Sequence, residues 1–414
     1  MVKVCDAIMG SGKSQAAITY MNQHPDKRFI YITPYNDEDK RIANACPGLH
    51  FQIPSEKIPE YHFLKIEHTR ALLKDGKNIA TTHAAFRFYT EDMIGDIEKY
   101  NYTLIIDEAV DFFQETTYKK GDVDVFLDGG FIEFVDGQYS YTGKEYTGSK
   151  MRELFKMLKC NNLIRVESGS RDGWDYYYWI TPPDVLNAFS EVFVLTYLFD
   201  NSELRFFFDI YGIPYTKIGV TYEDKCYHFI DDSSQSRCKY NIREKIHVLM
   251  DYKYNEVGKN TFALSANWMK THPHERDELK KKVSTFFNYN QRLKGKTSDD
   301  MIWSTYKKNR AHLTGSGMKN NFTEFNLKAE NKYRDKTSLA YLVNIFLSPQ
   351  KRNFFAKFGI EYDADMYALS IMVQWIWRSG IREGKDIEIY IPSRRMRELL
   401  LHWMETLPEA KEVA

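Results

Sequence analysis

The sequence predicts an α/β protein with two parallel-sheet domains and a β-rich insertion in the first of them. The chain has 414 residues, which is too many for one ordinary hydrophobic core. Short apolar runs alternate with helix-like stretches in both halves, a pattern typical of parallel sheets covered by helices on both faces. Between residues 115 and 190 the pattern changes to aromatic runs flanked by turn signals, which indicates inserted hairpins.

The strands of the first domain are predicted by apolar runs bounded by polar turns: VKVCDAIM, RFIYITP, KNIATTH and YTLIIDEA. Helix-like stretches lie between them, at 14–24 and 37–45. In the insertion, the turn signals VDGQ and SRDG accompany aromatic runs such as WDYYYW, and a short helix is expected at 148–160. The α/β pattern returns with EVFVLTYLFD, so the first domain is expected to span residues 1–200.

The second domain is expected to span residues 201–414. Its strand candidates are KIHVLM, NTFALSA and DIEIYIPS, which are short apolar runs between polar segments. Its helices are expected near 275–290, 336–347, 365–379 and 393–405.

The composition indicates a soluble protein of a reducing compartment. Hydrophobic residues make up 43% and charged residues 28%, and no apolar run is long enough to cross a bilayer. The start, MVKVCDAIMG, lacks the pattern of a signal peptide, and the five cysteines are scattered without a CxxC pair. The expected location is the cytoplasm of a bacterial or phage-infected cell. Cys226, His228 and Cys238 lack a fourth ligand, which argues against a zinc site.

The net charge of zero conceals a division between the two halves. The whole chain has 57 Lys and Arg and 57 Asp and Glu. Residues 1–200 carry 22 Lys and Arg and 30 Asp and Glu, which leaves 35 Lys and Arg and 27 Asp and Glu for residues 201–414. Much of the basic excess lies at 270–310, in ERDELKKKV, QRLKGK and YKKNR. Such runs suit either a phosphate backbone or a solvated helix face, and composition leaves both open.

A phosphate-binding loop is predicted at residues 7–15, AIMGSGKSQ, between a strand and a helix. In that context the backbone N–H groups of Gly10, Ser11 and Gly12 turn toward phosphates. Lys13 is expected to reach the β- and γ-phosphates of ATP, and the Ser14 hydroxyl to bind Mg²⁺. The general pattern GxxxxGK[ST] has Ala7 in place of its first glycine.

A second motif, LIIDEAV at 104–110, places two acidic residues at the end of an apolar strand. Asp107 is expected to hold Mg²⁺, and Glu108 to act as the general base toward the attacking water. The interval of 93 residues between Ser14 and Asp107 leaves room for strand–helix units. A GTPase is disfavoured because NKYRD at 331–335 has its acid one place late for a guanine-binding motif.

These motifs resemble those of superfamily 2 helicases of the DEAD-like kind, and more narrowly the phage-type and viral origin-binding-like members. AIMGSGKS is similar to motif I and IIDEAV to motif II, while YITPYNDEDKRI at 31–42 and ATTHAAF at 80–86 resemble segments that hold nucleic-acid phosphates at strand ends. The resemblance implies two RecA-like domains. It also implies nucleic-acid contacts in the first domain, at Thr33, Pro34, Arg41, Thr82 and His83.

Further segments sit where this family has its remaining motifs. VLTYLF at 194–199 resembles motif III with Thr196 kept, FALSANW at 262–268 lies at the place of motif IV, and residues 309–344 lie at the place of motif V. The resemblance implies nucleic-acid contacts in the second domain, at Ser265, Asn267, Thr314, Asn331 and Arg334.

The segment QWIWRSGIREG, residues 374–384, resembles motif VI, QxxGRxxR, whose arginines reach the γ-phosphate. Gln374 and Arg378 match at the family spacing, but Trp377 replaces the glycine and Arg382 lies one place beyond the second family arginine. On a helix these three polar residues would share a stripe within about 80°. The resemblance implies catalytic roles for Gln374, Arg378 and Arg382, and a structural ion pair is the alternative for either arginine.

The function implied is that of an ATP-dependent helicase or translocase, with ATP and Mg²⁺ as cofactors. Its partner would be nucleic acid, expected to be single-stranded or forked DNA in replication or recombination. No association with a membrane is expected. The insertion at 115–190 is a candidate strand-separating wedge or protein-binding surface. One alternative is a non-unwinding, nucleic-acid-stimulated ATPase that works with a protein partner. Another is a binding module with a decayed ATP site, which the intact Lys13, Ser14, Asp107 and Glu108 argue against.

Overall fold

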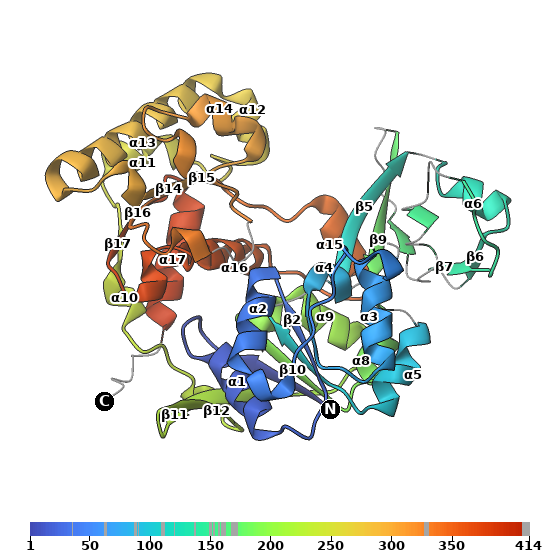
Figure 1. Ribbon diagram of the computed structural model, residues 1–414. Helices are drawn as coiled ribbons and strands as arrows, with labels where there is room; N and C mark the ends of the chain where they lie inside the picture. The colour runs from blue at the N-terminus through green and yellow to red at the C-terminus, as the bar shows by residue number, and fades with distance from the viewer. Residues whose placement is uncertain are drawn as a thin grey trace. The chain divides into compact units, whose positions relative to one another are not determined.

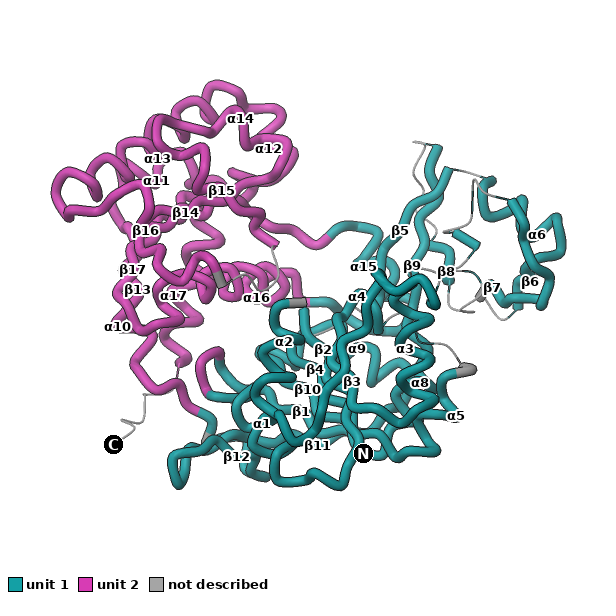
Figure 2. Tube along the Cα trace, in the orientation of Figure 1, with its two compact units in different colours: residues 1–8, 12–236, 348–362 teal, residues 9–11, 237–347, 363–414 magenta. Residues whose placement is uncertain are grey.

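The computed structural model divides the chain into two compact units (Figure 2). The first comprises residues 1–8, 12–236 and 348–362, and the second comprises 9–11, 237–347 and 363–414. The residues that the structure describes are 1–34, 36–61, 64–86, 89, 91–108, 112–119, 121–135, 138–148, 151, 154–155, 158, 163–166, 173–326 and 331–407.

The first unit is built on a seven-stranded sheet with the strand order β12-β11-β1-β10-β4-β2-β3. All neighbours pair in parallel except β12, which forms an antiparallel hairpin with β11. The strands are β1 (Val2–Asp6), β2 (Phe29–Thr33), β3 (Ile79–Thr82), β4 (Thr103–Asp107), β10 (Glu191–Thr196), β11 (Tyr215–Glu223) and β12 (Cys226–Ile230). Figure 1 shows helices on both sides of this sheet, as the apolar runs predicted.

The first unit's helices are α1 (Lys13–Gln23), α2 (Asn36–Ala45), α3 (Lys65–Lys74), α4 (His83–Phe86), α5 (Glu91–Lys99), α8 (Pro183–Asn187) and α9 (Glu203–Ile210). Helix α1 lies close to the sheet because its inner face carries small residues. Ala16 and Ala17 are buried in one core cluster with Tyr31 of β2 and Ile105 of β4. This packing fixes the amino terminus of α1 over the strand ends.

The insertion forms an antiparallel sheet of its own with the order β5-β9-β8-β7-β6. Its elements are β5 (Phe113–Lys119), α6 (Asp124–Asp128), β6 (Ile132–Val135), β7 (Gln138–Tyr141), β8 (Leu163–Val166) and β9 (Trp174–Ile180). Tyr177 and Trp179 of β9 are buried in its core, and Tyr178 between them is buried too, so the second half of the WDYYYW run serves packing. The helix expected at 148–160 falls largely outside the described residues.

The first unit extends beyond the boundary expected after residue 200. Strands β11 and β12 belong to its sheet because β11 pairs in parallel with β1. Helix α15 (Pro349–Ala356) also returns to it from much later in the chain. There the Phe354 ring stacks on Tyr178 at 4.1 Å between centroids, and Lys351 pairs with Glu203 at 2.5 Å. The division at 200/201 therefore differs from the one in the structure.

The second unit contains a five-stranded, wholly parallel sheet with the order β13-β17-β16-β14-β15. Its strands are β13 (Ile246–Val248), β14 (Met301–Ser304), β15 (Phe322–Thr323), β16 (Ser338–Tyr341) and β17 (Ile387–Tyr390). Its helices are α10 (Ile242–Lys245), α11 (Tyr252–Asn255), α12 (Ala266–Thr271), α13 (Pro273–Lys294), α14 (Arg310–Leu313), α16 (Ala364–Ile376) and α17 (Arg394–Thr406).

Two elements of the second unit differ from expectation. The helix predicted at 336–347 is strand β16, because a fully buried apolar run reads the same as a helix or a strand. The strand predicted at NTFALSA is a turn, in which Leu264 has a φ of 63°. The buried Asn344 amide holds that turn by donating to the carbonyls of Thr261 and Ala263 at 2.8 and 2.9 Å. Only the later contact from residue 344 distinguishes the turn from a strand.

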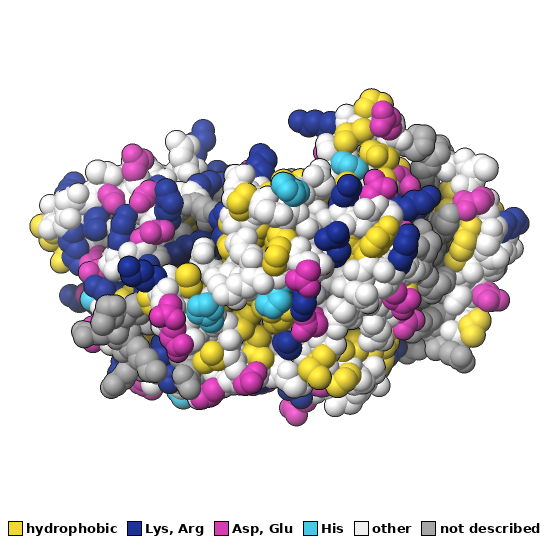
Figure 3. All heavy atoms as spheres, turned by 60° about the horizontal axis from the view of Figure 1, so that its bottom comes forward, with side chains coloured by type: hydrophobic (Ala, Val, Ile, Leu, Met, Phe, Trp, Pro, Cys, Tyr) yellow, Lys and Arg dark blue, Asp and Glu magenta, His cyan; other side chains and the backbone are white. Residues whose placement is uncertain are grey.

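The surface of the molecule is mixed in charge. On the face drawn in Figure 3, Lys and Arg side chains lie among Asp and Glu side chains. Within the described part of the chain, no helix combines the length and apolar character needed to cross a membrane.

The Phe354 ring is predicted to anchor α15 in the first unit. Phe354→Ala should lower the free energy of unfolding of that unit by about 3–5 kcal/mol, because it empties a fully buried aromatic site between Tyr178 and Phe113. Urea unfolding followed by tryptophan fluorescence measures the change. Phe358→Ala, on the same segment but 40% exposed, is the matched control. Equal losses for the two variants would contradict this account of α15.

Candidate nucleotide-binding site

The loop between β1 and α1 has the backbone conformation that a phosphate-binding loop requires. Gly10 and Gly12 have φ values of 79° and 91°, in the left-handed region that glycine adopts without steric cost. A Cβ on Gly12 would also lie 2.2 Å from the Tyr227 ring. The loop begins where the Ala7 N–H donates to the Thr196 carbonyl at 3.1 Å, so β10 holds its first residue.

The Lys13 side chain curls back into this loop. Its ammonium donates to the Ala7 and Ile8 carbonyls, the latter at 3.1 Å. Burial lowers the pKa of Lys13, and nearby acidic groups, among them Asp107 and Glu108, oppose the shift. The ammonium is therefore hydrogen-bonded to main-chain oxygens whose place the oxygens of a bound phosphate can take.

The Asp107 carboxylate, at the end of β4, is the point at which β2, β4 and helix α1 meet. Its Oδ2 accepts hydrogen bonds from the Ser14 hydroxyl and from the Tyr31 hydroxyl, each at 2.8 Å. Burial raises the pKa of Asp107, and the hydrogen bonds from Tyr31 and Ser14 oppose the rise. The main-chain carbonyl of Asp107 lies 2.9 Å from His83 Nε2, so β3 and β4 are tied together beneath the site.

The donor set fits Mg²⁺. The Ser14 hydroxyl and the Asp107 carboxylate are hard oxygen ligands held side by side at the phosphate loop. Mg²⁺ in nucleotide sites takes one or two protein oxygens and fills its other positions with phosphates and water. In the same loop, the Ser11 hydroxyl is 2% exposed and makes no hydrogen bond to any described residue, which suits a bound anion.

Glu108 follows directly in a strained backbone conformation. Its φ is 63°, while its N–H donates to the Leu195 carbonyl at 2.9 Å and its side chain is exposed. A left-handed conformation costs a non-glycine residue about 1–2 kcal/mol, and such strain clusters at functional sites. The chain therefore turns sharply after Asp107.

The other candidates of the first unit lie at the carboxyl ends of β2 and β3. Thr33 and Thr82 are register partners there, and Pro34 follows Thr33. The Thr33 hydroxyl donates to Asp39 at 2.7 Å, and His83 lies against Asp107, so both also have structural contacts. Arg41 of α2 pairs with Glu38 at 2.5 Å.

Tyr31 is a residue of the site that motif matching missed. It lies in the middle of β2, opposite Ile105 of β4, and is fully buried. A tyrosine within an apolar strand could have indicated it, because a buried tyrosine hydroxyl needs a polar partner and Asp107 ends a neighbouring apolar strand.

Gln374, Arg378 and Arg382 do not form the expected helical stripe. Helix α16 ends at Ile376, and a 3-10 turn, Gly380–Glu383, carries Arg382. The Gly380 N–H donates to the Lys336 carbonyl at 2.7 Å, and a Cβ on Gly380 would lie 3.0 Å from that carbonyl oxygen. Gln374 and Arg382 are exposed, whereas Arg378 is 7% exposed.

The remaining candidates of the second unit have local structural roles or lie at the surface. Ser265 caps α12 by accepting from the Trp268 N–H at 3.2 Å, and the Thr314 hydroxyl donates to the Arg310 carbonyl at 2.7 Å. Asn267 and Arg334 are exposed. Asn331 begins the 3-10 helix Asn331–Tyr333.

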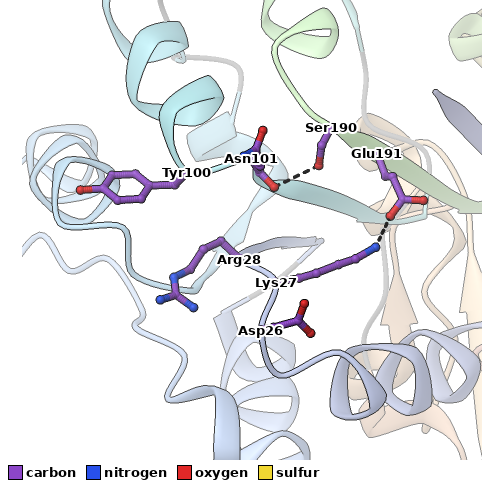
Figure 4. Close-up of a pocket in the computed structure, with 7 residues that line it drawn as sticks. All are labelled: Asp26, Lys27, Arg28, Tyr100, Asn101, Ser190 and Glu191. Carbon is purple, nitrogen blue, oxygen red and sulfur yellow. Dashed lines mark hydrogen bonds and ion pairs between the residues drawn. The ribbon is translucent and has the colours of Figure 1, made fainter.

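A separate pocket of about 480 Å³ lies at the amino-terminal edge of the first sheet, away from the phosphate loop. Figure 4 shows its lining residues, with Lys27 directed toward Glu191 at the start of β10. Burial acts to raise the pKa of Glu191, but hydrogen bonds from Lys27, Lys3 and Tyr20 outweigh it and hold the pKa at about 2. The hydrogen bonds that Glu191 of β10 accepts from Lys3 of β1, Tyr20 of α1 and Lys27, just before β2, join these elements.

Comparisons with known proteins agree with this architecture. A family model described as the YonV C-terminal Rossmann-like domain matches residues 240–404. The SPbeta prophage-derived protein YonV of Bacillus subtilis (strain 168) is 36% identical over 416 residues, covering 98% of each protein. A solved structure of apo XPD has a TM-score of 0.51 at 12% identity, covering 99% of this chain and 96% of that one. A structure of XPD helicase gives a TM-score of 0.49 at 11% identity, covering 99% and 95%.

The likeness to apo XPD shows a shared fold, and the predicted class of two RecA-like parallel-sheet domains is confirmed. The high identity over nearly the whole length shows the family. The chain therefore belongs to the family of the prophage protein YonV.

Proposed function

We propose that this protein is a nucleic-acid-dependent ATPase that acts as a superfamily 2 helicase or translocase. The observation that carries the proposal is the hydrogen bond of 2.8 Å between Ser14 Oγ and Asp107 Oδ2. It brings the two residues that a magnesium–nucleotide site needs to the mouth of a loop with the left-handed glycines of a phosphate cradle.

Binding of ATP would begin with an exchange of partners at Lys13. Its ammonium leaves the Ala7 and Ile8 carbonyls for phosphate oxygens, while the N–H groups of Gly10, Ser11 and Gly12 surround the phosphate chain. Mg²⁺, held by Ser14 and Asp107, would neutralise charge on the β- and γ-phosphates. Tyr31 keeps the Asp107 carboxylate oriented through its hydroxyl.

Glu108 is the proposed general base. Its carboxylate is exposed, and we propose that it accepts the proton of the attacking water. The bond from the Glu108 N–H to the Leu195 carbonyl helps to hold its main chain in the left-handed region, at a φ of 63°.

The second unit is proposed to complete catalysis through Arg378, with Gln374 and Arg382 as exposed partners in the same segment. A guanidinium brought to the γ-phosphate stabilises the charge that develops during phosphoryl transfer. Arg378 follows the end of α16, whereas Arg382 lies in the 3-10 turn after it. We assign the role of arginine finger, the arginine that contacts the γ-phosphate, to Arg378 because its buried position limits its motion.

DNA is the proposed substrate, in replication or recombination of a phage-type element, because the relative YonV is prophage-derived. Contacts to its backbone are proposed at Thr33, Pro34, Arg41, Thr82 and His83, which gather near the strand ends of the first sheet. In the basic half of the chain, they are proposed at Ser265, Asn267, Thr314, Asn331 and Arg334.

The insertion supports a second candidate, a non-unwinding ATPase that works with a protein partner. Among its described residues, several large apolar side chains are substantially exposed: Val125 at 57%, Phe134 at 54%, Val135 at 45% and Trp174 at 43%. Exposed apolar groups of this kind favour a protein-binding surface, and a wedge between strands would use the same rings.

ATP hydrolysis is predicted to depend on nucleic acid and on Lys13. Single-stranded DNA should raise the ATPase rate of the wild-type protein, and Lys13→Ala should abolish it, because the ammonium is the only described cation seated within the loop. Phosphate release with single-stranded DNA, duplex DNA and RNA as activators, beside an unwinding assay, measures both. Activity without strand separation would favour the partner-dependent ATPase. A rate indifferent to every nucleic acid would contradict the helicase proposal.

Arg378 is predicted to serve turnover and not nucleotide binding. Arg378→Ala should reduce ATP turnover by about a thousandfold or more, the usual loss for an arginine finger, while ATP affinity changes by less than about tenfold. Equilibrium binding and single-turnover kinetics separate the two effects, and Arg382→Ala, in the 3-10 turn that follows, shows whether the neighbouring arginine shares the role. Melting temperatures of both variants test the structural alternative. Wild-type turnover in folded Arg378→Ala would exclude Arg378 as the finger.

A further inference from the structure

The β11–β12 hairpin presents an aromatic ring to the phosphate loop. The Tyr227 ring lies where a Cβ on Gly12 would stand, with ring atoms 2.2–2.5 Å from that position. Gly12 is the residue that caps α1, directly before Lys13. The ring is therefore in contact with the outer side of the loop that would hold the phosphates.

A second tyrosine extends this aromatic surface outward. Tyr222 is the register partner of Tyr227 across the hairpin, and their ring centroids are 4.9 Å apart at an interplanar angle of 56°. Tyr227 is half-buried against the core, whereas Tyr222 is 40% exposed. Together the two rings form a continuous aromatic surface that runs from the core to the solvent beside the loop.

The hairpin is built to hold these rings in place. Its two turn residues, Asp224 and Lys225, have φ values of 49° and 64°, as in the tight turns that set strands directly opposite each other. Neither residue is glycine, so the turn is strained. Two residues after Tyr227 in β12, the Phe229 ring stacks on Phe193 of β10 with 5.1 Å between ring centroids. The rings are thus fixed by packing as well as by the turn.

The order of the strands indicates which end of a nucleotide would reach the hairpin. The Ser14–Asp107 pair joins α1 to the end of β4, so the metal and the terminal phosphate of the proposed site would lie on the β4 side of β1. Strands β11 and β12 lie on the opposite side of β1. Because the base and the γ-phosphate are at opposite ends of a nucleoside triphosphate, a base leaving the loop would meet the hairpin.

We propose that Tyr227, with Tyr222 beside it, is the platform on which the base of the bound nucleotide stacks. This inference rests on the proposed ATP site and adds to it the residues that recognise the base. Stacking reads the face of a ring and not its hydrogen-bonding edge, so it tolerates different purines. The site should therefore prefer purine nucleotides to pyrimidine nucleotides and to bare triphosphate, and should distinguish ATP from GTP only weakly.

The test compares ligands with and without a base on the full chain. Equilibrium binding is measured by calorimetry for ATP, GTP, CTP and inorganic tripolyphosphate, each with Mg²⁺. ATP and GTP should bind wild-type protein about tenfold or more tightly than tripolyphosphate, the size expected of one stacked base. Tyr227→Leu should remove most of this difference and leave tripolyphosphate affinity unchanged. Tyr227→Phe should preserve it, and Tyr222→Ala should reduce it in part.

Tyr100→Leu is the matched control, because the Tyr100 ring also lies against a left-handed glycine, Gly76, but elsewhere in the first unit. It should leave the preference unchanged. Tyr227→Leu with the full preference for ATP would overturn the inference. Equal losses for ATP and tripolyphosphate would overturn it too, since Tyr227 would then only support the loop. Failure of wild-type protein to bind either ligand would overturn the proposed ATP site itself, and the inference with it.

Discussion

The hydrogen bond between Ser14 and Asp107 is the contact on which the organisation of the first unit depends. The two residues are 93 positions apart in sequence, yet their side chains meet at 2.8 Å. They meet because β1 and β4 both pair with β10 in parallel, which brings their carboxyl ends to one edge. Tyr31 joins the same carboxylate oxygen from β2. Partial burial disfavours the charge of Asp107, so these donors, and a cation, are what stabilise the ionised carboxylate there.

The buried strands and the left-handed backbone segments that follow them have different roles in the first unit. The residues of β2 are all buried, and those of β4 are buried up to Asp107. Directly beyond the strands, the backbone enters the left-handed region at Gly10, Gly12 and Glu108, and again at Leu198 after β10. The buried strands supply the stability that holds these conformations. The same edge therefore carries both the glycine-rich loop that is proposed to hold phosphates and the sharp turn at Glu108.

Local patterns were sufficient to predict part of this structure. The strands that precede the glycine-rich loop and carry Asp107, the position of that loop between β1 and α1, and the β-rich insertion all follow from apolar runs, glycines and turn signals that act over a few residues. Long-range contacts decided the rest. The pairing of β11 with β1 and the return of α15 moved segments of the second half into the first unit. Tyr31 entered the site through a neighbouring strand, and the Gly380 N–H, beyond the end of α16, donates to the carbonyl of residue 336. None of these contacts is visible in a short window of sequence.

The central claim is that the Asp107 carboxylate, held beside Ser14, binds the metal of a nucleotide site. The most direct measurement is ATP affinity with excess Mg²⁺ and with chelator, in wild-type protein and in Asp107→Asn. The amide is nearly isosteric and still accepts hydrogen bonds from Ser14 and Tyr31, so the fold should be kept. In the wild type, Mg²⁺ should strengthen binding by more than about tenfold, equivalent to about 1.4 kcal/mol. In Asp107→Asn most of this gain should vanish, while affinity in chelator stays the same. An equal gain from Mg²⁺ in both proteins would contradict the account.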